Sequence, residues 1–277
     1  MLLPGVYTTT KKNGDILYRS SITYQGKHIS LGSFPSEEAA HLAYLEACRL
    51  LGRTIEGMED SSKASQAPLT LSSYSSFRCH LPFEKWVTLL NFRDNGIYFK
   101  TPIYLKHKYF LYYLDPATQL KFAVDDLFYY AEHKIMQRGG HLFVADFGMQ
   151  VNILSRYGIK NFAVPGRDYL FANGDTTDFR YENIIIINKY NGVQKQEENG
   201  RTFYLAKIHI RGDYIIGRFS TEAEAAVAYN KAADYLHQVG LKKQFTLNYI
   251  PELSTREYLR IYEEILLPKK IQSLRFS

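Results

Sequence analysis

Hydrophobic and polar residues alternate from residue 18 to residue 25, and this alternation predicts a β-strand with two different faces. One face carries Tyr18, Ser20, Ile22 and Tyr24, and the other carries Arg19, Ser21, Thr23 and Gln25. Farther along, Ala39, Ala43 and Ala47 recur at helical spacing. They predict a helix whose narrow stripe of small residues lets it pack closely on a sheet. The pattern therefore predicts an α+β unit.

The whole pattern occurs twice, in residues 5–52 and in residues 192–240. With two short gaps, the matching residue pairs are Gly5 and Gly192, Val6 and Val193, Gly14 and Gly200, Tyr18 and Tyr204, Ile22 and Ile208, Gly26 and Gly212, Gly32 and Gly217, Phe34 and Phe219, and Tyr44 and Tyr229. Agreement at so many turn and core positions indicates two copies of one module. We expect each copy to form a three-stranded antiparallel sheet that one helix covers on one side.

Turn and capping residues mark the ends of the expected elements. Dipeptides typical of hairpin turns are Asn13-Gly14, Gln25-Gly26, Asn199-Gly200 and Arg211-Gly212, and the third strand of each copy is expected to end near Gly32 or Gly217. The expected caps are Ser36 and Gly52 for the first helix, a capping box of Thr221 with Glu224 for the second, and a capping box of Ser254 with Glu257 for a C-terminal helix that Pro268 stops.

These signals divide the chain into five segments. They are a first module at 1–53, a Ser-rich linker at 54–76, an aromatic-rich α+β domain at 77–191, a second module at 192–250, and a C-terminal helix and tail at 251–277. Residues 53–76 contain seven serines and almost no aliphatic periodicity, which is typical of a linker.

The composition is that of an ordinary globular protein, because 45% of the 277 residues are hydrophobic and 22% are charged. No apolar run approaches the ~20 residues of a membrane helix, and the N-terminus lacks the pattern of a secretory signal. Two cysteines exclude a disulfide framework and a four-thiolate zinc site. We expect a cytoplasmic protein without a membrane partner, associated with the nucleoid if it is bacterial. The net charge of +6 permits a polyanionic partner.

Basic residues concentrate on the expected strands, whereas acidic residues gather on the expected helices. The strand regions carry Lys11, Lys12, Arg19 and Lys27 against Asp15 in the first copy, and Lys195, Arg201, Lys207, Arg211 and Arg218 against Glu197, Glu198 and Asp213 in the second. Because a helix covers one face of each sheet, the other face is expected to be basic and polar. A ribbon of this kind fits the ~12 Å major groove of B-DNA. The alternative interpretation is a solvated sheet face with ordinary lysines.

The run YRSSITYQGKHISLGSFPSEEAAHLAY and its second copy resemble the Apetala-type DNA-binding domain of plant ethylene-response factors and its relatives in phage and mobile elements. The shared signature includes Leu31-Gly32-Ser33-Phe34, in which the second copy has Ile216 in place of the leucine. The resemblance implies that the sheet lies in the major groove and that outward-pointing strand residues contact DNA. By position these are Tyr7, Thr9, Ser21, Thr23, His28 and Ser30, and then Gln194, Gln196, Lys207, His209, Asp213 and Ile215.

Phosphate contacts are expected from Lys11, Lys12, Arg19, Lys27, Lys207, Arg211 and Arg218, and base contacts from Thr23, His28, Lys207 and His209. The plant domains carry several Arg and Trp at the contact positions, and this chain mostly does not, so their target sequence does not transfer.

The segment from Tyr169 to Asn188, with Asn173-Gly174-Asp175, Asp178, Arg180 and Glu182-Asn183, resembles the ββα-metal core of HNH homing endonucleases, in which such a segment precedes an Apetala-type domain. Hydrolysis at such a site needs a His that activates water, beside ligands for a divalent ion. Phe171 occupies the position of the His, Leu170 that of a usual Asp, and the downstream His is missing. We therefore expect a degenerate HNH-like domain, a spacer or extra DNA-contacting surface, with no catalytic residue, metal or cofactor.

Other candidates are interpreted as structural. His133 and His141 lack neighbouring ligands at metal-binding spacing, and Cys48 and Cys79 are expected to be core or neutral thiols. The aromatic residues Tyr109, Phe110, Tyr112, Tyr113, Phe128, Tyr129 and Tyr130 are assigned to core packing rather than to stacking on single-stranded bases.

The sequence therefore predicts a non-enzymatic protein that binds double-stranded DNA, a regulator or a phage or mobile-element protein. Two alternatives stay open, a homing or nicking endonuclease of HNH type and a protein-binding assembly factor with a vestigial nuclease fold. The C-terminal helix, with Lys269, Lys270 and Arg275, could add phosphate contacts or form the seam of a homodimer.

Overall fold

The computed structural model describes residues 2–10, 12–53, 68–75 and 78–276, and it has the predicted α+β class. The chain divides into two compact units. The first unit consists of residues 1–151 with 176–180, and the second of residues 152–175 with 181–277. Each unit contains one copy of the repeated module.

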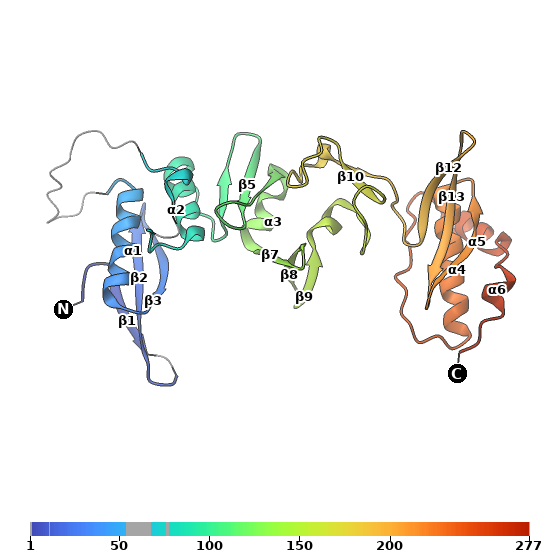
Figure 1. The fold of residues 1–277 in the computed structure, drawn as a ribbon, viewed down its shortest axis with the longest axis horizontal. Helices are drawn as coiled ribbons and strands as arrows, with labels where there is room; N and C mark the ends of the chain where they lie inside the picture. Colours follow the sequence, from blue (N-terminus) through green and yellow to red (C-terminus); the bar gives the residue numbers. More distant parts are fainter. Residues whose placement is uncertain (1, 11, 54–67, 76–77, 277) are drawn as a thin grey trace. The chain divides into compact units, whose positions relative to one another are not determined.

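The first module contains the predicted sheet and helix. The strands β1 (Val6–Thr10), β2 (Ile16–Tyr24) and β3 (Lys27–Phe34) form an antiparallel sheet in sequence order. The helix α1 (Glu37–Leu50) lies across one face of this sheet (Figure 1). Ser36 caps the helix as predicted, because its side chain accepts a hydrogen bond from the amide of Ala39. The sheet therefore keeps one face uncovered by its own helix.

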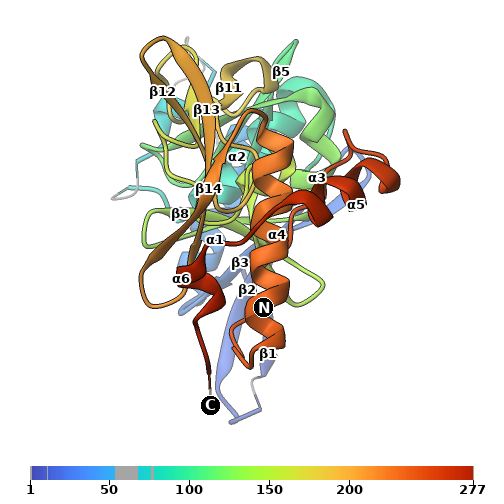
Figure 2. The same ribbon diagram turned by 90° about the vertical axis from the view of Figure 1, so that its right-hand side faces the viewer.

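The second module has the same fold. Its strands β12 (Val193–Glu198), β13 (Arg201–His209) and β14 (Asp213–Phe219) are antiparallel and in sequence order. The helix α4 (Glu222–Gln238) lies along one face of the sheet (Figure 2), and the capping box predicted at its start is present. Because both copies share strand order and helix position, the repeat in the sequence is a repeat in the structure.

The third strand of each module continues two residues past the end that the glycines predicted. It reaches Phe34 in the first copy and Phe219 in the second. The pairing register shifts at matching places, between Ser20 and Ser21 in β2 and between Ala206 and Lys207 in β13. This irregularity lets Phe34 and Phe219 lie on the helix side of their sheets together with Leu31 and Ile216, which precede them by three residues.

Gly5 and Gly192 form the same close approach in the two modules. A Cβ atom on Gly5 would lie 2.2 Å from Cδ2 of Tyr44, and one on Gly192 would lie 2.1 Å from Cδ2 of Tyr229. Both glycines have positive φ angles, +76° and +70°. A side chain at either position would therefore be strained and would collide with the tyrosine, which explains why these glycines and tyrosines match between the copies.

The core of the first module continues into the next helix, α2 (Phe83–Asn95). Ile22 and Leu31 share one buried cluster with Trp86 and Leu90. Residues 68–75, which include the short 3₁₀ helix η1 (Leu71–Ser73), also pack here. The Nε1–H of Trp86 donates to the carbonyl of Thr70 across 3.1 Å. Residues 54–67 and 76 of the predicted linker lie outside the described residues.

The rest of the first unit contains two small antiparallel sheets. Its elements are β4 (Ile103–Leu105), β5 (Tyr109–Tyr113), β6 (Gln119–Ala123), η2 (Val124–Asp126), α3 (Leu127–Glu132), β7 (Ile135–Arg138), β8 (His141–Asp146) and β9 (Met149–Asn152), whose last residue belongs to the second unit. Phe110, Tyr112 and Tyr130 are buried, as the aromatic clustering predicted. The prediction was wrong for Phe128, which is 83% exposed because it lies on the outer side of the short helix α3.

The second unit contains the elements η3 (Ile153–Tyr157), β10 (Tyr169–Phe171), η4 (Tyr181–Asn183) and β11 (Ile184–Ile186) before the second module, and α5 (Thr255–Glu264) and α6 (Lys269–Gln272) after it. The capping box predicted at the start of α5 is present. Pro268 does not stop α5, which ends at Glu264; the proline is the N-cap of α6, a position that needs no amide donor.

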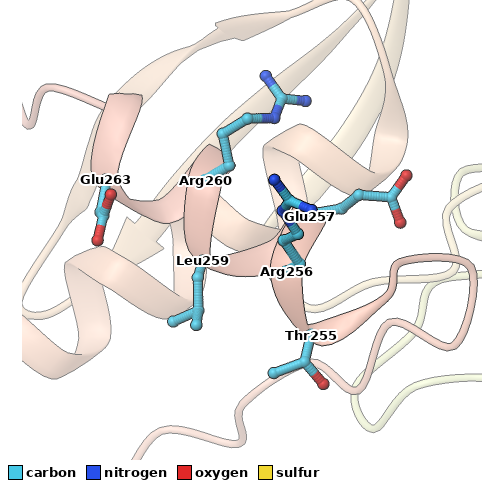
Figure 3. A pocket seen from close by; sticks show the side chains of 6 residues that line it. All are labelled: Thr255, Arg256, Glu257, Leu259, Arg260 and Glu263. Atoms are coloured by element: carbon cyan, nitrogen blue, oxygen red, sulfur yellow. The ribbon is translucent and has the colours of Figure 1, made fainter.

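The C-terminal helices complete the core of the second module. Ile261 of α5 and Ile271 of α6 belong to the same buried cluster as Ala225 and Ala232 of α4. The outer side of α5 is mostly charged, with Leu259 between arginine and glutamate side chains (Figure 3). The apolar side of α5 is thus packed against its own chain. The homodimer expected through this helix stays a prediction.

None of the helices in the described ranges combines the length and apolar character that crossing a bilayer requires.

Candidate nucleic-acid interface

The first module has an open face, which we define as the side of the sheet opposite α1. Strand pairing places side chains on it in rows, Tyr7 with Arg19 and Ser33, Thr9 with Leu17, Ser21 with Ser30, and Thr23 with His28. The intervening residues Ile22 and Ile29 are buried against the helix, so the alternation fixes the direction of the others. Six contact candidates of the first copy, Tyr7, Thr9, Ser21, Thr23, His28 and Ser30, thus lie together on this face, with Arg19 among them.

The open face of the first module carries cationic and hydroxyl groups. Arg19 is exposed, and in the part of the chain that the structure describes it makes no ion pair. Oγ1 of Thr23 and Nδ1 of His28 lie 3.4 Å apart. The nearest acidic residue in the sequence, Asp15, belongs to the β1–β2 turn, where Asn13 Nδ2 donates to its carboxylate across 2.7 Å. The side chains presented by this face therefore suit a polyanion.

Two further basic candidates of the first module lie off the open face. Lys27 pairs with Tyr24 on the helix side of the sheet, and its Nζ lies 4.8 Å above the ring of Tyr98. Lys12 is exposed in the β1–β2 turn. Lys11 lies outside the described residues.

The second module has a corresponding open face, defined as the side of its sheet opposite α4. Its rows are Gln194 with Leu205 and Arg218, Gln196 with Phe203, Lys207 with Ile215, and His209 with Asp213. All contact candidates of the second copy therefore lie on one face, as the alternation predicts. Arg211 is exposed in the β13–β14 turn.

The cations of the second open face are engaged with carboxylates of the same face. Nζ of Lys207 lies 2.6 Å from Oδ2 of Asp213, and Nδ1 of His209 lies 2.8 Å from Oδ1 of Asp213. Hydrogen bonds from Lys207 and His209 hold the pKa of Asp213 below its ordinary value. Arg218 lies 2.8 Å from Glu198 and 4.6 Å above the ring of Phe203. This face is therefore less cationic than its basic residues suggested.

The segment from Tyr169 to Asn188, which we call the nuclease-like segment only for the resemblance in its sequence, contains Asn183 in a structural role. Its Oδ1 accepts a hydrogen bond from the amide of Asn173 across 2.9 Å, and its Nδ2 donates to the carbonyl of Asp175. Oδ1 of Asn173 accepts from the amide of Asp175 across 2.8 Å. Phe171, which the resemblance predicted at the position of a catalytic His, pairs with Ile184 in the β10–β11 ladder. These contacts close the loop between the two strands, and the phenylalanine at position 171 accepts no proton.

Asp178 is committed to ion pairs within the first unit. Its side chain is buried, with Arg180 Nη2 at 2.6 Å and Lys121 Nζ at 3.6 Å from Oδ2. Burial raises the pKa of Asp178, but the hydrogen bonds from Arg180 and the charge of Lys121 outweigh it and hold the pKa below its ordinary value. The carboxylate therefore anchors residues 176–180 beside β6.

Within the described ranges, no cluster of three or more His, Cys, Asp or Glu side chains has the arrangement of a metal site. Between Ile186 and Val193 the structure, which describes all of these residues, has no helix, so β10 and β11 lead directly into β12. His133 stacks on the ring of Tyr129, and its Nδ1 lies 2.9 Å from the carbonyl oxygen of that residue. Cys48 is buried in the first module.

Sequence reasoning missed a charged cluster beside the second open face. Asp168 is buried, with Nζ of Lys160 at 3.0 Å and Nη2 of Arg167 at 2.7 Å. Lys160 and Arg167 line a pocket of about 290 Å³ together with Lys207 and His209. Lys160, Arg167 and Asp168 lie in an irregular segment whose sequence has no periodicity. The adjacent Arg167-Asp168 pair was the one feature of the sequence that could have indicated an ion pair there.

Comparison of the chain with protein-family models, with curated proteins and with solved structures gives no match.

Proposed function

We propose that this chain is a non-enzymatic protein that binds double-stranded DNA through the open faces of its two modules, with the first module making the main contacts. One observation carries the proposal. Each module leaves one face of a three-stranded sheet uncovered by its helix, and on the first of these faces Arg19 lies among polar side chains without a carboxylate partner in the described ranges.

The dimensions of the modules support a major-groove contact. Strands in a sheet are about 4.8 Å apart, so three strands span roughly 10 Å between the outer backbones. The major groove of B-DNA is about 12 Å wide. A three-stranded face with short polar side chains, such as Thr23 and Ser30, therefore approaches the base edges without steric obstruction, while Arg19 contacts phosphate or guanine.

Two modules on one chain compensate for weak individual contacts. Once the first module is bound, the second acts at a high effective concentration on neighbouring DNA. Its open face, with cations engaged by Asp213 and Glu198, then contributes to a bipartite site although it binds weakly alone. A DNA partner agrees with the net charge of +6 and with the expected location in the cytoplasm, on the nucleoid in a bacterium.

The first experiment is selection of random duplex DNA on the purified full chain at moderate salt, followed by sequencing. We expect enrichment of a bipartite motif. With about six phosphates contacted, the logarithm of the affinity should fall with the logarithm of the salt concentration at a slope of about −5. A binding constant that does not change with salt would contradict the proposal.

A variant of Arg19 tests which face binds. Arg19→Gln removes one cation from the open face of the first module, and we expect the slope of the salt dependence to become shallower by about 1 with weaker binding. Lys108→Gln is the matched control, because Lys108 is also exposed and belongs to the β4–β5 turn of the same unit. Equal effects of the two variants would show that the charge acts without regard to its position and would refute binding by this face.

A further inference from the structure

Phe162 is an aromatic residue that is almost fully exposed and held in a strained backbone conformation. The residue has 96% of its surface exposed, and its φ angle is +60°. The amide of Ala163 donates to the carbonyl of Lys160, so Phe162 is the third residue of a tight turn. Positive φ at that position is normally left to Gly or Asn, because a bulky side chain there is strained.

The turn that carries Phe162 is firmly anchored at its first residue. Nζ of Lys160 lies 3.0 Å from Asp168 and donates to the carbonyl oxygens of Tyr190 and Val193 at 3.0 and 3.3 Å. The side chain of Lys160 is only 10% exposed. These bonds tie the turn to the start of β12, so the exposed ring projects from a rigid base.

Cationic side chains lie beside the ring. Phe162 lines the pocket of about 290 Å³ with Arg167, Lys207 and His209. The carboxylates of Asp168 and Asp213, which bind Arg167 and Lys207, line the same pocket, so a phosphate would compete with them. The guanidinium of Arg167 uses Nε and Nη2 to bind Asp168, at 3.1 and 2.7 Å, and half of its side chain stays exposed. An exposed aromatic ring with arginine and lysine at the edge of a sheet face matches the chemistry of a DNA base and its flanking phosphates.

We propose that Phe162 stacks on a base of the bound DNA as a wedge at one base step, while Arg167 and Lys207 contact the phosphates on either side. The inference rests on the proposed function and specifies how the second module engages DNA. A wedge must unstack a base step, so its ring must keep its position when it meets the DNA. The anchored turn supplies this rigidity. Glycine would relieve the backbone strain at position 162, but it has no ring to insert.

Base stacking by Phe162 can be measured with 2-aminopurine, whose fluorescence rises when it leaves the base stack. The fluorophore is placed in turn at each adenine of the selected duplex, and the full chain is added. We expect the wild type to raise the fluorescence at one step. Phe162→Gly should abolish this rise and weaken binding roughly tenfold. The same substitution should raise the melting temperature, because glycine accepts the positive φ, and this excludes misfolding as the cause.

Phe147→Gly is the matched control. Phe147 is 97% exposed with a φ angle of +45°, and it belongs to the β8–β9 turn of the other unit. We expect it to raise the melting temperature without changing the 2-aminopurine signal. Wild-type binding without a fluorescence rise at any step, or a rise that persists in Phe162→Gly, would overturn the wedge and leave the proposed function standing. Absence of duplex binding by the wild type would overturn both.

Discussion

Nζ of Lys207 and Oδ2 of Asp213 lie 2.6 Å apart across the open face of the second module. In the first module His28 occupies the position of Asp213, and its cross-strand neighbour is Thr23, whereas that of Asp213 is His209. The two copies therefore share a fold but differ in the electrostatics of the face that we propose for DNA. A phosphate group that approaches Lys207 competes with a carboxylate that is already bound there.

Removal of this carboxylate should strengthen DNA binding. In Asp213→Asn, Lys207 and His209 no longer neutralise an internal charge, so we expect roughly tenfold tighter binding of the selected duplex at moderate salt and a salt slope steeper by about 1. Fluorescence anisotropy over a salt series measures both quantities. Glu197→Gln is the control, since Glu197 is an exposed carboxylate on the helix side of the same sheet. Unchanged or weaker binding in Asp213→Asn would show that this face does not contact phosphate.

The buried carboxylate of Asp168 should be important for the stability of the second unit. Asp168→Asn leaves Lys160 buried without a full counter-charge, and we expect a loss of about 3–5 kcal/mol in the free energy of unfolding. Urea unfolding followed by far-UV circular dichroism measures it. The double variant Lys160→Met with Asp168→Leu removes both charges and should recover most of the loss. A single variant as stable as the wild type would show that the pair is not needed.

The same carboxyl group gives an expected pH dependence. Burial raises the pKa of Asp168, but hydrogen bonds from Arg167, the amide of Val164 and Lys160 outweigh it, so the pKa lies below its ordinary value. A group with a depressed folded-state pKa stabilises the protein above its unfolded pKa of about 3.9, and this contribution disappears as the pH falls through the folded value. The free energy of unfolding of the wild type should therefore fall below about pH 4, with a smaller fall in Asp168→Asn.

The sequence predicted the elements whose signals are local. Strand alternation, the Asn199-Gly200 turn and the capping boxes at Thr221 and Ser254 each depend on a few neighbouring residues, and each is present. The repeat strengthened these predictions, because two copies constrain one fold. The contact candidates came from the resemblance to the Apetala-type domain, and their common direction agrees with the period-2 alternation of the strands.

Features that depend on tertiary contacts were not predictable in this way. Lys27 was counted with the open-face cations, yet the edge of the sheet directs it to Tyr98, which is far along the chain. The ion pair between Asp213 and Lys207 depends on the register of β13 with β14, which places Asp213 opposite His209, two residues from Lys207. Phe162 and its anchor Lys160 lie in a segment without periodicity, so their roles became visible only with the turn geometry and the buried Asp168.

The close approach of Gly5 to Tyr44 predicts a stability difference between two glycines. In Gly5→Ala the new methyl group meets the ring at 2.2 Å and the φ angle is +76°, so we expect a loss of about 2–5 kcal/mol. Gly14→Ala is the control, because Gly14 has a φ of +89° but nothing within 4 Å of an added Cβ among the described residues. There we expect only the backbone strain, about 1–2 kcal/mol.

The single tryptophan makes this comparison specific to the first unit. Trp86 belongs to the same buried cluster as Ile22 and Leu31, so its fluorescence follows unfolding of that core. Equal losses of stability in the two glycine variants would mean that Tyr44 yields to the methyl group, and that the repeated Gly–Tyr contact reflects backbone conformation alone.

The nuclease-like segment should not cleave DNA. Phe171 accepts no proton, and the carboxylate of Asp178 is already bound by Arg180 and Lys121, so neither residue serves as the general base or as a ready ligand for a divalent ion. We expect supercoiled plasmid to stay intact with the purified full chain and Mg²⁺, under salt conditions in which the duplex is bound. Relaxation of the plasmid that needs Mg²⁺ and disappears in Asp175→Ala would establish the endonuclease alternative. Relaxation that persists in Asp175→Ala would show that the carboxylate of Asp175 is not needed for cleavage, because the backbone contacts that Asp175 makes with Asn173 and Asn183 survive the loss of its side chain.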